Sequence, residues 1–63
     1  MTLPEIKNAI DNNKIVYWKN HAYRVIKDNL GQYFIQCQHN QHCIGLTWQD
    51  NMTLNGKESD FFI

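Results

Sequence analysis

Hydrophobic residues at the start of the chain follow a helical period. A capping-box pair, Thr2 and Glu5, precedes this segment, and Pro4 stands in the first turn, where its missing N–H is tolerated. Asn12-Asn13 ends the pattern after about two and a half turns. The sequence therefore predicts a short N-terminal helix that must pack to be stable. Its single apolar face is formed by Leu3, Ile6, Ala9 and Ile10.

From Ile15 onward the pattern changes to β-branched and aromatic runs separated by turn residues. Strands are predicted over 15–18, 22–27, 33–37, 42–48 and 58–63, with a short extended segment over 52–54. Turns are predicted over 19–21, 28–31, 38–41 and 49–51, and Asn55-Gly56 is a strong hairpin dipeptide. Such short connections make neighbouring strands antiparallel.

The register of the central hairpins follows from Gly31, which suits the left-handed position of a three-residue loop. A slip of one residue would move the whole apolar set to the wrong face. A competing register would pair Cys37 with Cys43 and set Ile35 opposite Gly45, which is less favourable. The preferred pairs are Tyr23–Cys37, Val25–Ile35, Ile35–Ile44 and Tyr33–Leu46.

The predicted fold class is α+β. We expect a short N-terminal helix packed on a curled, antiparallel β-meander of four to five strands, with a small SH3-like barrel as the closed alternative. At 63 residues, a second hydrophobic core does not fit, so residues 1–63 are expected to form one compact domain.

Composition and charge limit the binding partners and the cellular location that we expect. Six Lys/Arg balance six Asp/Glu, so no overall field holds the chain on nucleic acid or on an anionic membrane. No apolar run approaches the roughly 18 residues of a membrane span, and Met1 to Asp11 lacks the form of a signal peptide. A cytoplasmic protein without a membrane partner is expected.

The charges are unevenly distributed. Four cations and no acid lie between Lys14 and Lys27, interleaved with aromatic rings, so this hairpin could stack bases and contact phosphates. The alternative is ordinary alternation, with an aromatic ring in the core and the cations outside. The candidate binding residues are Lys14, Trp18, Lys19, His21, Arg24 and Lys27, together with Trp48 from a later segment.

Two cysteines and two histidines lie within seven residues, at Cys37, His39, His42 and Cys43. Zinc takes such ligands, but their spacing does not match the usual paired arrangement. Strand alternation would also separate Cys43 from Cys37, which disfavours a disulfide. Catalysis by a Cys–His pair lacks a visible pocket or oxyanion donors. Ordinary thiols and solvent-facing histidines are the preferred interpretation, with no metal and no cofactor.

Several segments resemble a group of small proteins of unknown function encoded by bacterial phages and prophages. The resemblance covers Lys14 to Ile63, and no known activity or ligand comes with it. It implies a stand-alone protein of a mobile element, acting in a bacterial host cell by binding a macromolecule. The segments that carry it are Val16-Tyr17-Trp18, Tyr23-Arg24-Val25-Ile26-Lys27-Asp28, Gly45-Leu46-Thr47-Trp48-Gln49-Asp50 and Thr53 to Ile63.

These observations favour a non-enzymatic interaction protein that binds a protein partner. Eight large aromatic side chains exceed what so small a core can bury, so some are expected at the surface. Weak binding of single-stranded nucleic acid through the 14–27 hairpin is the alternative. An enzyme that uses a metal or a thiol is the least favoured.

Overall fold

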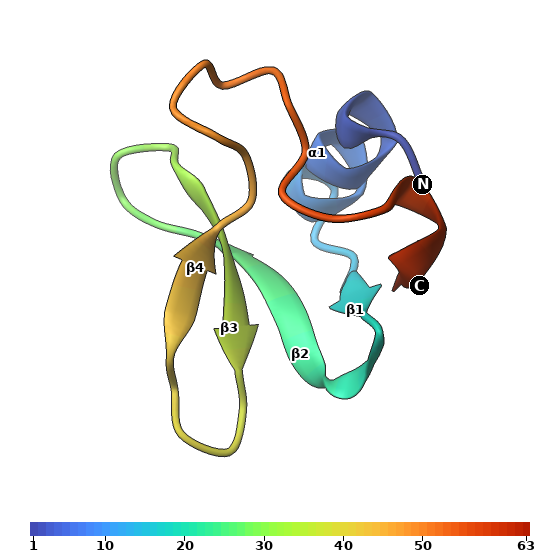
Figure 1. Cartoon of the computed structure of the whole chain (residues 1–63), viewed down its shortest axis with the longest axis vertical. Helices are drawn as coiled ribbons and strands as arrows, with labels where there is room; N and C mark the ends of the chain where they lie inside the picture. The colour runs from blue at the N-terminus through green and yellow to red at the C-terminus, as the bar shows by residue number, and fades with distance from the viewer.

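The computed structural model describes all residues, 1–63, as one helix on a five-stranded antiparallel sheet (Figure 1). The predicted α+β class is confirmed. The strands follow the order β4-β3-β2-β1-β5 across the sheet. In chain order the elements are α1 (Leu3–Asp11), β1 (Tyr17–Trp18), β2 (Asn20–Lys27), β3 (Tyr33–Cys37), β4 (Cys43–Gly45), a 3-10 turn (Glu58–Asp60) and β5 (Phe61–Phe62).

Helix α1 begins at the predicted capping box. The backbone N–H of Glu5 donates to Thr2 Oγ1 (3.3 Å), and that of Thr2 donates to Glu5 Oε1 (2.8 Å). These hydrogen bonds lower the pKa of Glu5. Ile6 and Ala9, from the predicted apolar face, are buried, and the helix ends at the Asn12 cap. Local sequence signals therefore determine both the ends of this helix and the face that it buries.

Strands β2, β3 and β4 pair in the predicted antiparallel register. Strand β1 is shorter than the predicted 15–18 segment, and β2 begins at Asn20, inside the predicted 19–21 turn. Val25 pairs with Ile35, Tyr23 with Cys37, and Ile35 with Ile44. Gly31 adopts a φ of 81°, the left-handed conformation that the tight β2–β3 loop requires. Beyond the end of β4, the N–H of Leu46 still donates to Tyr33 O at 3.1 Å, which continues the same register.

The chain after β4 departs from the prediction. The strand predicted over 42–48 pairs only at Cys43–Gly45, and the following residues pair with the 52–54 segment through a Thr47–Leu54 bridge. Asn55-Gly56 is not a hairpin turn. The side-chain Nδ2 of Asn55 donates to Gly45 O (3.1 Å), so the amide ties this segment to β4.

The predicted fifth strand, 58–63, is also corrected. Residues 58–60 form the 3-10 turn, and only Phe61–Phe62 is a strand. It pairs with β1 at the edge of the sheet opposite β4. The pairs are Tyr17–Phe62 and Trp18–Phe61. The physical reason is burial: in this position Phe61 is 3% exposed and completes the core beside β1.

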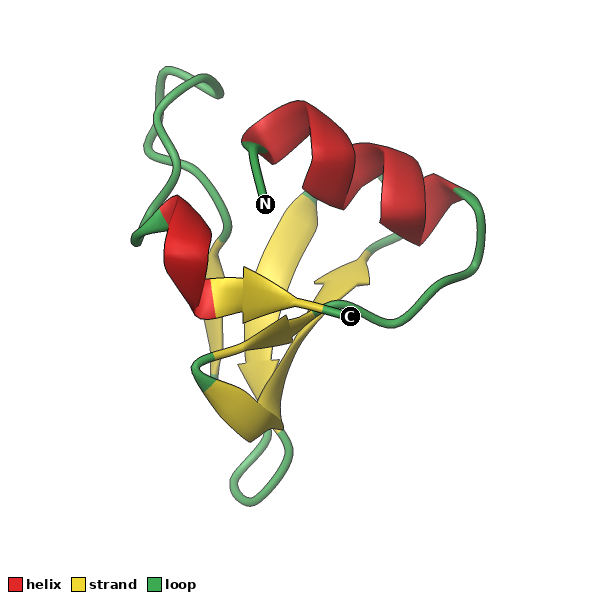
Figure 2. Cartoon of the chain, turned by 90° about the vertical axis from the view of Figure 1, so that its right-hand side faces the viewer, coloured by secondary structure: helices red, strands yellow, loops and turns green.

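The two faces of the sheet differ in what covers them. Helix α1 lies across the inner face (Figure 2), and the core forms between them. No element covers the opposite, outer face. Strands β4 and β5 form the two edges, so the sheet is open and closure into a small barrel is not confirmed. The core residues are Ile6, Ala9, Val16, Val25, Ile35, Leu46 and Phe61.

Candidate binding surfaces

The sheet separates the residues of the predicted basic and aromatic hairpin. Lys27 lies at the C-terminal end of α1, where it binds Asp11, and the exposed Lys14 follows that helix end. Trp18 packs against the core on the inner side, whereas Arg24 pairs with Tyr17 on the outer face. Alternation along the strands causes this division. The predicted site residues therefore do not form a single patch.

Lys27 is bound by a carboxylate at the end of α1. Asp11 Oδ1 accepts hydrogen bonds from Lys27 Nζ (3.0 Å) and from Tyr33 Oη (2.8 Å). These bonds, that of Lys27 first, lower the pKa of Asp11, and the Asp11 bond raises the pKa of Lys27. Burial, followed by the Asp11 hydrogen bond, raises the pKa of Tyr33. This group of Asp11, Lys27 and Tyr33, which we call the Asp11 clasp, joins α1 to β2 and β3. A phosphate would have to compete with Asp11 for Lys27.

Trp18 is partly buried and packs against the edge of the core. Its ring lies edge-on to Tyr23, with ring centroids 5.3 Å apart, and 6.3 Å from Phe61. Lys19 Nζ sits over the same ring, 4.5 Å from its centroid. A Cβ at Gly56 would lie 3.0 Å from Trp18 Nε1, so the chain passes close to the indole. Base stacking on Trp18 would have to displace the Lys19 side chain.

Three aromatic rings gather on the outer face near the β1–β2 turn. The His21 ring lies 4.5 Å from that of Tyr17 and 5.4 Å from that of Phe62, in both cases edge to face. The Tyr17 and Phe62 rings are 5.5 Å apart. Of the predicted residues, His21 belongs to this cluster. Tyr17 and Phe62, from β1 and β5, were not predicted as site residues.

The outer face continues from this cluster across the sheet. Cross-strand pairing places Arg24 beside Tyr17, and then Gln36 beside Arg24. Ile26 and Phe34 form the next row toward the β2–β3 loop. None of the five strands contains an Asp or Glu. The outer face is thus aromatic and apolar, with one cation and no carboxylate of its own.

A second exposed apolar feature is the Trp48 loop, which we define as residues 48–53. Trp48 is 63% exposed and Met52 is 79% exposed. Figure 1 shows the loop in orange, at the opposite end of the molecule from the tip of the β3–β4 hairpin. Met52 was not among the predicted site residues. It was placed at the start of the extended segment 52–54, and the predicted turn 49–51 directly before it was a signal for exposure.

Hydrogen bonds hold the Trp48 loop in one conformation. The N–H of Trp48 donates to Thr53 O (2.9 Å), and that of Asn51 donates to Trp48 O (3.0 Å). Asp50 Oδ1 accepts from the N–H groups of Met52 and Thr53, both at 2.9 Å, and Asp50 Oδ2 accepts from Thr53 Oγ1 at 2.6 Å. These bonds lower the pKa of Asp50 from 3.8 to about 2. The backbone that carries the exposed apolar side chains of the loop is therefore held in place by hydrogen bonds.

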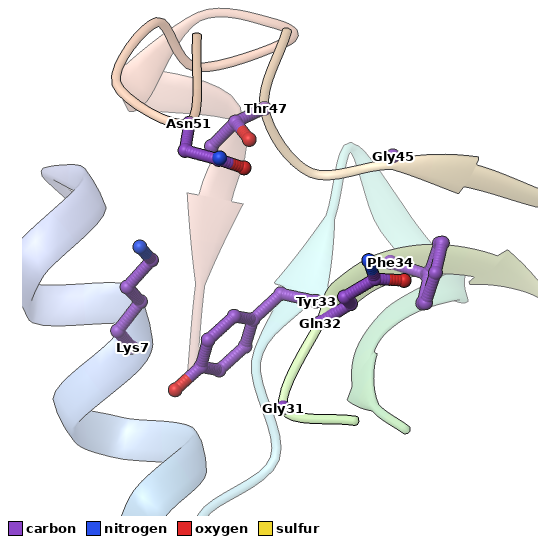
Figure 3. Close-up of a pocket in the computed structure, with 8 residues that line it drawn as sticks. All are labelled: Lys7, Gly31, Gln32, Tyr33, Phe34, Gly45, Thr47 and Asn51. Atoms are coloured by element: carbon purple, nitrogen blue, oxygen red, sulfur yellow. The ribbon is translucent and has the colours of Figure 1, made fainter. Parts of the chain in front are cut away.

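A polar hollow of about 460 Å³ lies between α1, the start of β3 and the Trp48 loop (Figure 3). The Lys7 side chain extends into it from the helix, and the Tyr33 ring forms one wall. A Cβ at Gly31 would meet nothing within 4 Å, whereas one at Gly45 would lie 3.1 Å from Thr47 O. The sequence prediction did not include Lys7, because nothing in its local pattern distinguishes it from other helical lysines. The eight lining residues are Lys7, Gly31, Gln32, Tyr33, Phe34, Gly45, Thr47 and Asn51.

The cysteines and histidines around the β3–β4 hairpin are dispersed. Cys37 is buried and Cys43 is exposed, and both are free thiols. Cys37 and His42 line a shallow hollow of about 240 Å³, but the hydrogen bond between them joins backbone atoms, Cys37 N to His42 O at 2.8 Å. No three His, Cys, Asp or Glu side chains are grouped where they could hold a metal ion.

Comparison of the chain with models of protein families, with curated proteins and with solved structures finds no match. The helix of the structure is too short and too polar to cross a membrane. The binding surfaces described above are therefore the basis for a functional proposal.

Proposed function

We propose that this protein is a non-enzymatic binding protein that engages a partner protein through the Trp48 loop. The observation that carries the proposal is the exposure of Trp48 and Met52 on a loop that hydrogen bonds keep ordered. Neither side chain belongs to the buried core. Trp and Met are enriched at protein interfaces, and Trp is among the residues that most often carry binding energy.

The order of the loop strengthens this proposal. Binding through a flexible loop loses conformational entropy, which reduces affinity. Here Asp50 and Thr53 already hold the loop by hydrogen bonds of their backbone and side chains. The loop therefore loses less conformational entropy when a partner binds.

The proposal includes a setting and a fold type. We place the protein in the cytoplasm of a bacterial host, as a product of a phage or another mobile element, on the resemblance described above. We also propose that the open sheet is a variant of an SH3-like barrel. The last strand returns beside β1 after a 3-10 turn, an order that supports this relationship.

Affinity capture from host lysate, with nuclease added, tests the proposal. Trp48→Ala and Met52→Ala should each lose a protein that the parent retains, and Trp48→Ala should weaken binding by about 2 kcal/mol or more. Leu30→Ala is the matched control, because Leu30 is 84% exposed in a different turn. The captured proteins are identified by mass spectrometry. The proposal fails if the folded Trp48→Ala variant retains the same proteins as the parent.

Single-stranded nucleic acid is a second candidate partner, and the outer face of the sheet favours it. Tyr17, Phe62 and His21 offer rings near Arg24, and no carboxylate on the strands opposes a phosphate. Aromatic rings on an open sheet are a common platform for unpaired bases. With so few cations, this binding would be weak and would fall steeply with salt.

Fluorescence anisotropy with single-stranded oligonucleotides at low salt tests this second candidate. Tyr17→Ala should weaken binding by about 1–3 kcal/mol if its ring stacks on a base. Arg24→Gln should weaken binding and reduce its salt dependence. Lys57→Gln, an exposed cation outside the sheet, is the control. An unchanged anisotropy of every single-stranded probe with the folded parent would exclude single-stranded nucleic acid as a partner.

A further inference from the structure

The hollow beside α1 is lined by hydrogen-bond donors and contains no acid. The ammonium of Lys7, the amides of Gln32 and Asn51 and the hydroxyl of Thr47 all border it. Tyr33, the remaining polar side chain, already donates its hydroxyl proton to Asp11 at 2.8 Å. Figure 3 shows the Lys7 ammonium on the side that faces Thr47 and Asn51. The lining therefore has a positive charge and an excess of donors.

Lys7 makes no hydrogen bond or ion pair within the protein. Its Nζ lies 5.4 Å from the centroid of the Tyr33 ring. The pKa of Asp11 is lowered first by the Lys27 and Tyr33 hydrogen bonds and only last by the charge of Lys7, which acts from a longer range. Asp11, the carboxylate on the same helix that would neutralise it, accepts from both Lys27 and Tyr33. Two cations thus share one carboxylate around Tyr33, and a positive charge remains beside the hollow.

We propose that this hollow is a binding site for an oxyanion, either a carboxylate or a phosphate group. Lys7 supplies the charge, and the amides of Gln32 and Asn51 and the hydroxyl of Thr47 supply hydrogen bonds that orient the anion. At about 460 Å³ the hollow has room for the anionic group and part of the molecule that carries it. The site goes beyond the proposed protein interface: it shares Asn51 with the Trp48 loop but uses neither Trp48 nor Met52.

Titrations followed by NMR of the backbone amides test this site. Sodium phosphate and sodium acetate are added separately, each against sodium chloride of equal ionic strength. We expect saturable shifts at Gln32, Thr47 and Asn51 in phosphate, in acetate or in both. The salt that saturates at the lower concentration identifies which oxyanion the site prefers. Linear shifts without saturation in both salts would overturn the proposal.

Two lysine variants separate the site from general attraction of anions. Lys7→Gln should weaken the saturable binding at least about tenfold, whereas Lys14→Gln should leave it unchanged. Lys14 is an exposed cation in the connection between α1 and β1, so it controls for the loss of one positive charge. Equal binding by the parent and by folded Lys7→Gln would also overturn the proposal. Neither result depends on the capture of a protein through the Trp48 loop.

Discussion

Four turns of this domain use the same local hydrogen bond. A side-chain oxygen of Asn20, Asp28, Asn40 or Asp50 accepts the backbone N–H two residues later, at 2.8 or 2.9 Å. Short polar side chains suit such turns because they bond to the adjacent backbone. These Asn and Asp residues therefore have a structural role.

At the residue scale, measuring the pKa of Asp50 tests whether its hydrogen bonds hold the Trp48 loop in solution. Hydrogen bonds to its ionised form lower the pKa from 3.8 to about 2. Their stabilising contribution is therefore fully present above 3.8 and is lost as the pH falls toward about 2. An NMR titration of the Asp50 carboxyl carbon should show the depressed midpoint, and Thr53→Ala should move it back toward 3.8.

Thr53→Ser is the control for that titration. It keeps the hydroxyl that donates to Asp50 Oδ2, so the midpoint should stay low. A parent midpoint near 3.8 would show that the loop is not held by Asp50 in solution. Hydrogen bonds to Asp50 would then not hold the backbone that carries Trp48.

At the element scale, α1 contributes to stability through the apolar face that it buries against the sheet. Ile6 is fully buried between the helix and the sheet, among Val16, Val25 and other core residues. A helix of nine residues is too short to be stable alone, so this packing holds it in place. The Asp11 clasp with Lys27 and Tyr33 adds a polar attachment at its C-terminal end.

Ile6→Ala should lower the free energy of unfolding by about 2–4 kcal/mol, because it leaves a cavity in the core. Asn8→Ala, at an exposed position on the same helix, removes only the hydrogen bond that Asn8 Oδ1 accepts from Asn12 Nδ2 at 3.2 Å, so it should change the free energy of unfolding by less than about 1 kcal/mol. Urea unfolding followed by tryptophan fluorescence measures both. Equal stability of the Ile6→Ala variant and the parent would mean that α1 does not support the core.

Elements with local signals were predicted well, and elements that depend on distant contacts were not. The capping box, Gly31 and the alternation along β2 and β3 all act within a few residues. By contrast, Asn55-Gly56 has the dipeptide of a hairpin turn, but contact with Gly45 and Trp18 determines its place. Local propensity could not reveal those neighbours, which lie far away in the sequence.

At the scale of the whole molecule, β5 connects the end of the chain to its beginning. It pairs with β1, and the Met1 ammonium donates to Glu58 O at 2.6 Å. Phe61 lies in the core from this position, packed near Trp18. The inner face of the sheet is therefore incomplete without the last strand.

Phe61→Ala should lower the free energy of unfolding by about 3–5 kcal/mol, a large share of the stability of a small domain. Phe61→Leu should cost less, and it keeps the comparison measurable if the alanine variant does not fold. Ile63→Ala is the control, because Ile63 is 67% exposed. Thermal unfolding followed by circular dichroism measures the series. A Phe61→Ala variant as stable as Ile63→Ala would show that β5 is not part of the core in solution.

The candidate surfaces were predicted only in part, for a related reason. Trp48 and His21 belong to surfaces that the structure presents, whereas Trp18 packs against the core and Lys27 is bound to Asp11. Net charge along the sequence indicated a basic hairpin. It could not show that a helix carboxylate would neutralise one of its cations, or that the sheet would divide the others.

The pairing of the first strand with the last also sets the order of events during synthesis. The β2–β3 and β3–β4 hairpins join neighbouring segments, so their ends close at little entropic cost and can form early. The β1–β5 pair is the longest-range contact in the sheet and cannot exist until Phe61 and Phe62 have been translated. Until then the core lacks Phe61, so a nascent chain has an incomplete core that the last strand completes.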